Sequence, residues 1–172
     1  MLPSILVSLI TLLGVLAASA TVVERQGVIT QPTTLHALTV GGTDLGALFA
    51  GGSVVTVSTT APGNLFALDP LTDTLNLQTL SDIFPPPHAF LEFPTATTGC
   101  EATAPLVFTL ATNDTCAVST GWSFEALLLK APVPGTFEVC SGEVFFVAAP
   151  TPTVSTNCTQ VEIVKGPTTT PS

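Results

Sequence analysis

The sequence predicts an all-β protein with a single compact domain, a sandwich or barrel of about eleven short strands. Long stretches alternate between apolar and polar residues with a period of two, and Gly, Pro, Asn or Asp interrupts them at short intervals. After residue 20, no segment sustains the apolar spacing of an amphipathic helix. Many short strands separated by turn residues are typical of sandwiches and barrels.

The first 20 residues have the pattern of a secretion signal. They contain no charged side chain and end in Ala18-Ser19-Ala20, the small-x-small pattern that signal peptidase cleaves. Their apolar run of about fourteen residues is shorter than the roughly 20 that a transmembrane helix needs. We therefore expect a signal peptide at 1–20, a soluble β-rich domain at 21–165 with no membrane contact after cleavage, and a disordered Thr/Pro-rich tail at 166–172.

The predicted strands follow one another between turns and are rich in β-branched, aromatic and leucine residues. The stretch "VGGTDLGALFAGG" (40–52) lacks both the GxGxxG and the GK[ST] pattern of phosphate-binding loops, so its Gly-Gly pairs indicate tight turns. The stretch "DIFPPPHAFLEFP" (82–94) is interpreted as a stiff connector that leads into a strand. Strands are expected at 35–40, 53–58, 64–68, 74–78, 89–93, 106–110, 116–120, 122–130, 136–140, 143–149 and 159–164.

The hairpin near the C-terminus can be paired residue by residue. If 141–142 form a two-residue turn, Cys140 faces Glu143. The same register places Phe137 opposite Phe146, so that one face of the hairpin is apolar. Cys140 then points away from that face and is free to reach a later segment.

Three hairpin-like units, at 65–78, 107–119 and 136–147, suggest a β-trefoil as an alternative fold. Each begins with a Phe-x-Leu or Phe-x-Val strand and continues through a polar turn. The phenylalanines of the three units are unevenly spaced along the chain, however. This spacing favours a sandwich or barrel over the trefoil.

The four cysteines are expected to form two disulfides. None belongs to a CxxC pair and no histidine lies at ligand spacing, so an exported chain uses them for cross-links rather than for metal. Three pairings are possible, and we favour Cys100 with Cys116 and Cys140 with Cys158, because each bridge would join neighbouring strands. Each bridge should contribute about 3 kcal/mol. No metal site and no cofactor are expected.

Two N-glycosylation sequons precede the second cysteine of each favoured pair. Asn113 begins the triplet "NDT" and Asn157 begins the triplet "NCT". In an unbroken strand, Asn157 would share a face with Val161 and Ile163, which should point into the core. We therefore expect Asn157 to lie in a loop and the strand to start after Cys158, or a bulge to reset the alternation there.

Charge and composition limit the possible partners. The formal net charge is −9, and Arg25, Lys130 and Lys165 are the only lysines and arginines. This balance disfavours nucleic acids and anionic membranes as partners. Only 9% of the residues are charged, so solubility must come largely from hydroxyl groups and glycans. Such a composition suits a wall or matrix environment, with wall polysaccharide or an extracellular protein as the candidate partner.

The sequence offers little for catalysis. The chain has no GxSxG motif, and its two histidines, His36 in a strand-like run and His88 in a Pro-rich loop, are interpreted as structural or exposed. Glu138 and Glu143 could approach the separation of a glycosidase pair across the hairpin, but no aromatic cleft surrounds them in the sequence. Trp122 should fill the core rather than stack on a sugar. We expect no enzyme and no catalytic residue.

The C-terminal third, "GTFEVCSGEVFFVAAPTPTVSTNCTQVEI" (135–163), resembles small exported fungal cell-wall proteins of the phialide type. In these proteins a Phe-x-x-Cys strand, a second strand, a polar loop and a final cysteine close a β-rich domain. The stretch "NLFALDPLTDTLNL" (64–77) is similar to their repeated hairpins. The chain departs from them in having no tyrosine. The resemblance implies a wall-associated protein without known catalysis, and it carries over Cys140 and Cys158 as a structural bridge.

Two functions follow as hypotheses. The first is a non-enzymatic, secreted or cell-wall-associated structural protein of a fungus, disulfide-bonded and glycosylated. The alternative is a secreted module or effector that binds a glycan or a protein, which an exposed apolar or aromatic patch around Trp122, Phe145 or Phe90 would favour. An enzyme would require His36 or His88 in a cleft beside two carboxylates.

Overall fold

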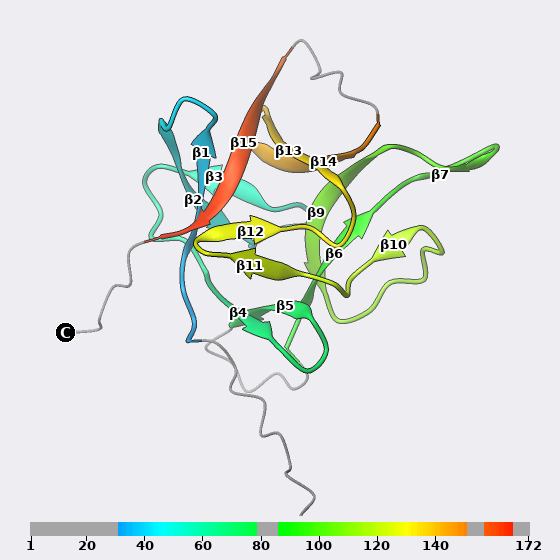
Figure 1. Cartoon of the computed structure of the whole chain (residues 1–172), viewed down its shortest axis with the longest axis horizontal. Coiled ribbons are helices and arrows are strands. Elements are labelled where there is room, and N and C mark those ends of the chain that lie inside the picture. The colour runs from blue at the N-terminus through cyan, green and yellow to red at the C-terminus, as the bar shows by residue number, and fades with distance from the viewer. Residues whose placement is uncertain (1–30, 79–85, 151–156, 167–172) are drawn as a thin grey trace, which may run out of the picture.

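The structure, a computed structural model, describes residues 31–78, 86–150 and 157–166 (Figure 1). These residues form fifteen strands and no helix, which confirms the prediction of an all-β domain. The predicted signal peptide and residues 167–172 of the predicted tail lie outside the described residues. The strands are β1 (Leu35–Thr39), β2 (Asp44–Phe49), β3 (Thr56–Ser58), β4 (Leu65–Asp69), β5 (Thr74–Gln78), β6 (His88–Glu92), β7 (Thr95–Ala96), β8 (Gly99–Cys100), β9 (Thr103–Thr109), β10 (Ala117–Val118), β11 (Ser123–Glu125), β12 (Leu128–Lys130), β13 (Gly135–Cys140), β14 (Glu143–Ala148) and β15 (Cys158–Lys165).

Six strands close into a barrel by their pairing, and all six are labelled in Figure 1. Around the barrel the order is β1, β2, β3, β14, β13 and β15, and β15 returns to β1. Every neighbouring pair is antiparallel. The contact between β3 and β14 is the shortest, because only Thr56 and Glu143 pair in register there. Closure leaves none of these six strands without two neighbours, which removes the exposed edges of an open sheet.

The remaining strands extend the sheet away from the barrel. β9 pairs with β14 and continues through β6 and β5 to β4, while β11 and β12 attach to β15. β7 and β8 form a separate small hairpin. β9 and β10 lie on either side of β6 instead of pairing with each other. The second unit expected for a trefoil is therefore not a hairpin, and the barrel is the form that the structure takes.

Alternation along the strands builds the core. On β1, Leu35 and Ala37 point inward, and on β15 Val161 and Ile163 do the same. Aromatic rings fill the centre, where Phe137 and Phe146 meet edge to face with their ring centroids 5.2 Å apart. Trp122 stacks on Phe137 at 6.5 Å and is only 1% exposed, so the prediction that it fills the core is confirmed.

The β13–β14 hairpin has the predicted register. Cys140 lies opposite Glu143, and Phe137 lies opposite Phe146. Ser141 and Gly142 form the turn with φ values of 53° and 87°. Positive φ at both central residues is typical of the type I′ turn, whose twist matches that of the flanking strands.

Two segments differ from the prediction. Residues 122–130, expected to form one strand, form the β11–β12 hairpin, in which the chain reverses at Ala126 with a φ of 54°. Residues 40–52, for which only turns at the Gly-Gly pairs are predicted and no strand, also contain the six-residue strand β2. Gly46 interrupts the apolar pattern of β2 because its φ of 127° and a carbonyl of β3 exclude a side chain. A Cβ at that position would overlap the carbonyl oxygen of Ser58.

Candidate functional site

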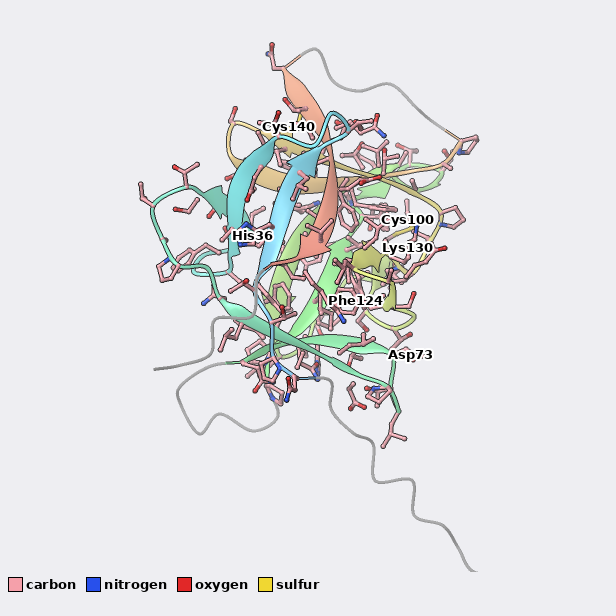
Figure 2. All side chains as sticks on the ribbon, turned by 60° about the vertical axis from the view of Figure 1, so that its left-hand side comes forward. His36, Asp73, Cys100, Phe124, Lys130 and Cys140 are labelled. Carbon is pink, nitrogen blue, oxygen red and sulfur yellow. A yellow bond between two sulfur atoms is a disulfide. The ribbon has the colours of Figure 1, made fainter. Side chains whose placement is uncertain are left out.

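Both predicted disulfides are present, and no cysteine is free. Cys140 and Cys158 lie directly opposite each other on β13 and β15, with their Cα atoms 4.3 Å apart. Cys100 of β8 is bonded to Cys116, which precedes β10, at a Cα separation of 5.7 Å. Figure 2 shows Cys100 and Cys140 well apart on the ribbon. Two intramolecular disulfides are typical of extracellular proteins, which is consistent with secretion.

Both sequon asparagines are exposed to solvent. Asn113 lies in the loop between β9 and β10. Asn157 lies in a turn, and β15 begins at the next residue, Cys158. The expectation that Asn157 precedes the strand is confirmed, since Val161 and Ile163 are buried while Asn157 is not. Both side chains are accessible to a glycosyltransferase, and their glycosylation stays a prediction.

His36 is paired with an acid on the outer face of the barrel. It lies on β1 and points away from the core, and its Nδ1 is 2.9 Å from Oδ2 of Asp44, near the start of β2. The other oxygen of Asp44, Oδ1, accepts a hydrogen bond of 2.8 Å from the backbone N–H of Gly46. The carboxylate is thus held at both oxygens and orients the imidazole ring. One carboxylate, not two, lies beside His36.

His36 and Asp44 line a hollow of about 460 Å³ on the outside of the barrel, which we call the β1–β3 hollow. Figure 2 shows His36 on the outer side of the strand ribbons. Thr34 also lines the hollow; it is 8% exposed, and its Oγ1 is buried without a hydrogen-bond partner among the described residues. The lining residues are Thr34, His36, Asp44, Gly46, Ala47, Ser58, Thr59, Ala61 and Pro62.

A larger hollow of about 610 Å³ lies among β12, the segment 131–134, β13 and β15. Its walls include buried apolar side chains of the core such as Phe137, Phe146 and Ile163. Gln160 and Glu162 are polar residues of its lining and are exposed. No buried polar atom of its described lining lacks a partner. The hollow therefore presents a mainly apolar wall and no polar group that requires a ligand.

The other candidate residues are not brought together into a site. Nδ1 of His88 is 2.6 Å from Oδ1 of Asn76, a contact that links β5 and β6. Glu138 is 3% exposed whereas Glu143 is exposed, and neither lines either hollow. Glu138 lies within 4.8 Å of the sulfurs of Cys140 and Cys158, but these sulfurs are bonded to each other and supply no thiolate for a metal.

The aromatic patch that would have favoured a binding module is not present in the described residues. Trp122 and Phe90 are buried, and Phe145 is partly buried. The large apolar side chains that are exposed come from separate segments of the chain rather than from one strand or loop. They are Val40, Phe49, Leu65, Leu71, Leu110 and Leu127.

The fold and these sites define a disulfide-bonded, all-β barrel domain with one polar hollow on its outer face. Comparisons with protein-family models, with curated proteins and with solved structures gave no match. Within the described residues, no helix is long and apolar enough to cross a membrane.

The β1–β3 hollow was not foreseen from the sequence. The sequence does not indicate which carboxylates could lie beside His36, and Asp44 follows a Gly-Gly pair that predicts a tight turn. The available signal was the eight-residue separation of His36 and Asp44 across the Gly41-Gly42 turn, which brings β1 and β2 side by side.

Proposed function

We propose that the chain is a non-enzymatic, secreted structural domain that associates with a fungal-type cell wall. The observation that carries the proposal is a closed barrel with two internal cross-links and exposed sequon asparagines at Asn113 and Asn157. Disulfides persist in oxidising environments outside the cell and stabilise small domains there. Glycans at the two asparagines would cover the surface of a chain that has few charges.

The chemistry of the described residues supports a non-catalytic role. All four cysteines are bonded in pairs, so no thiolate nucleophile is available. In the part of the chain that the structure describes, no Ser or Thr hydroxyl is hydrogen-bonded to His36 or His88, whose Nδ1 atoms contact Asp44 and Asn76 instead. A general base in hydrogen-bond contact with a nucleophile is the arrangement that covalent catalysis uses.

Fractionation of a culture tests the proposal. The full-length chain, with an epitope tag, is expressed in a filamentous fungus, and the culture is separated into medium, detergent-extractable wall and glucanase-released wall. We expect the protein to stay in the wall until the glucan is digested, and to shrink on treatment with an N-glycosidase. A chain without residues 1–20 is the matched control and should stay inside the cell. Protein found free in the medium, with no wall affinity, would refute the wall association.

A second function, a secreted binding module, is favoured by one observation. The buried Oγ1 of Thr34 has no partner among the described residues and belongs to the lining of the β1–β3 hollow. Binding to the immobilised chain, measured independently of its location, distinguishes this function from a purely structural one.

A further inference from the structure

We propose that the β1–β3 hollow is a binding site for a neutral, hydroxyl-rich ligand of the size of a sugar unit. The proposal concerns what the barrel binds and does not depend on where the protein is located. Its volume of about 460 Å³ falls within the range of about 300–1,000 Å³ that small-molecule sites occupy. Three features of its lining lead to the ligand class: an unpaired hydroxyl, an oriented imidazole and the local charge.

The unpaired hydroxyl is the first feature. Thr34 precedes β1 and is 8% exposed, and its Oγ1 has no partner in the described chain. The neighbouring Thr33 is also buried, but its Oγ1 donates to the carbonyl of Thr34 at 3.1 Å. Buried hydroxyls nearly always have a hydrogen-bond partner, because an unpaired one keeps the full cost of its lost hydration. Because Oγ1 has less than 1 Å² of accessible surface, a ligand hydroxyl in the hollow would supply the partner that Thr34 lacks only after the lining beside Gly166 shifts to admit it.

The imidazole of His36 is the second feature. Asp44 accepts from Nδ1, which places the ring proton of the neutral histidine on that nitrogen and leaves a lone pair on Nε2. Nε2 is therefore a hydrogen-bond acceptor for the ligand. The ring keeps this orientation because Gly46 holds the other oxygen of Asp44.

Polar atoms of Thr34 and His36 lie next to the same residue, Gly166. A Cβ at Gly166 would overlap both Thr34 Oγ1 and the imidazole edge that carries Nε2 of His36. The two polar atoms therefore lie close together beside the backbone of Gly166, at a residue that borders Thr34 and His36 but is not itself part of the lining. A hydroxyl group can donate to Nε2, and a neighbouring hydroxyl can pair with Oγ1. Adjacent hydroxyls of this kind are the defining feature of sugars and other polyols.

The charges around the hollow restrict the class of ligand further. Asp44 borders the hollow, Glu162 lies on the outward face of β15 next to β1, and the chain carries −9 overall, so anionic ligands are repelled. Both oxygens of Asp44 already accept N–H groups, which disfavours a metal cation. No lysine or arginine lines the hollow. Ala61 and Pro62 add small apolar surfaces that suit the C–H faces of a neutral ring.

Solution NMR on the secreted, full-length protein tests the site. The probes are glucose, mannose, N-acetylglucosamine and a β-1,3-linked glucose hexasaccharide, each added at neutral pH up to about 10 mM, tenfold above a Kd of 1 mM. The readout is the imidazole resonances of His36, assigned by their loss in His36→Gln. We expect a saturable shift with at least one probe. Binding of monosaccharides would identify a free sugar as sufficient, whereas binding of the hexasaccharide alone would identify a polysaccharide as the source.

Variants separate the site from general effects. Thr34→Val, which removes only the hydroxyl, should weaken binding about tenfold, as the loss of one hydrogen bond predicts. Thr34→Ser keeps the hydroxyl and should retain binding even if the valine variant folds poorly. Thr103→Val, an exposed threonine of β9 outside both hollows, is the matched control and should change nothing. The absence of a saturable shift with every probe overturns the proposal. Unchanged binding by Thr34→Val overturns it as well, and so does unchanged binding by His36→Gln, which is followed by the backbone amide resonances of β1 and β2 because that variant lacks the imidazole.

This experiment and the wall fractionation can fail independently. Retention in the wall without any sugar binding would leave the structural function standing and overturn the hollow as a site. Sugar binding by a protein found free in the medium would support the hollow and refute the wall association.

Discussion

Removal of the Cys140–Cys158 disulfide should lower the free energy of unfolding without changing the barrel. The change is the double variant Cys140→Ala/Cys158→Ala, which leaves no unpaired thiol. The two cysteines are 18 residues apart in the sequence and directly opposite on paired strands. The hydrogen bonds between β13 and β15 hold the native strands together without the bridge, so its main effect is to restrict the unfolded chain.

The expected magnitude follows from the length of the closed loop. For 18 residues the chain-entropy relation gives about 3 kcal/mol at 25 °C. For a domain of this size, each kcal/mol corresponds to about 2–4 °C, so the thermal midpoint should fall by about 6–12 °C. In urea unfolding followed by Trp122 fluorescence, the slope m should rise, because the unfolded chain without the bridge exposes more surface.

The Cys100–Cys116 disulfide provides the matched comparison. Its separation of 16 residues gives nearly the same entropic value, about 3 kcal/mol, although it lies outside the barrel on the β7–β8 hairpin. Cys100→Ala/Cys116→Ala should therefore cost about as much as the barrel variant. A loss above about 5 kcal/mol for the barrel pair alone would refute the reasoning, because it exceeds what the unfolded chain can account for. An unchanged midpoint would refute it as well.

Three further predictions concern packing, backbone strain and the hollow. Phe146→Ala, at a ring that is 1% exposed, should lower the free energy of unfolding in urea by about 3–5 kcal/mol. Phe49→Ala, at a partly exposed ring, should lower it by about 1 kcal/mol or less, and equal losses for the two variants would contradict the assigned core. Gly46→Ala should lower the free energy of unfolding, measured by thermal denaturation, by at least about 1–3 kcal/mol, because the residue has a positive φ and faces a β3 carbonyl. Gly52→Ala, at a position with open space around it, should leave the stability nearly unchanged, and an equally small effect at Gly46 would argue against the close approach of the β3 carbonyl. Thr34→Val should raise the free energy of unfolding of the ligand-free protein by about 1 kcal/mol, because it removes an unpaired buried hydroxyl. A decrease in the free energy of unfolding would show instead that Oγ1 has a hydrogen-bond partner in solution.

Local features of the fold could be predicted from the sequence. The β13–β14 register follows from a two-residue Ser-Gly turn, since the turn length decides which residues face each other. The same hairpin favours one of the three possible disulfide pairings without deciding it, because Cys140 points away from the apolar face and is free to reach a later segment. Asn157 could be placed before β15 because the parity of Val161 and Ile163 excludes it from that strand.

Long-range features could not be predicted. Closure of the barrel depends on pairing between β1 and β15, at opposite ends of the described chain, and no local pattern encodes that contact. The β11–β12 hairpin was missed because Ala126 and Leu127 are not turn residues by type. The sequence does not predict the β1–β3 hollow for two reasons. The hollow requires β2, and the glycine at position 46 interrupts the apolar pattern by which a strand would be recognised. The lack of a hydrogen-bond partner for Oγ1 of Thr34 depends on packing, which the sequence pattern does not reveal.

The position of β15 has a consequence for how the protein folds. β1 is the first strand of the described residues, yet one of its two neighbours is β15, so one edge of β1 stays unpaired until the chain has been synthesised through residue 165. Contacts between such distant segments slow folding, because a long stretch of chain must be ordered before they form. Cys140 likewise cannot form its disulfide until Cys158 has been synthesised. The barrel can therefore close only after β15 is available, and an oxidase that forms the Cys140–Cys158 bridge must act after residue 158 has been synthesised.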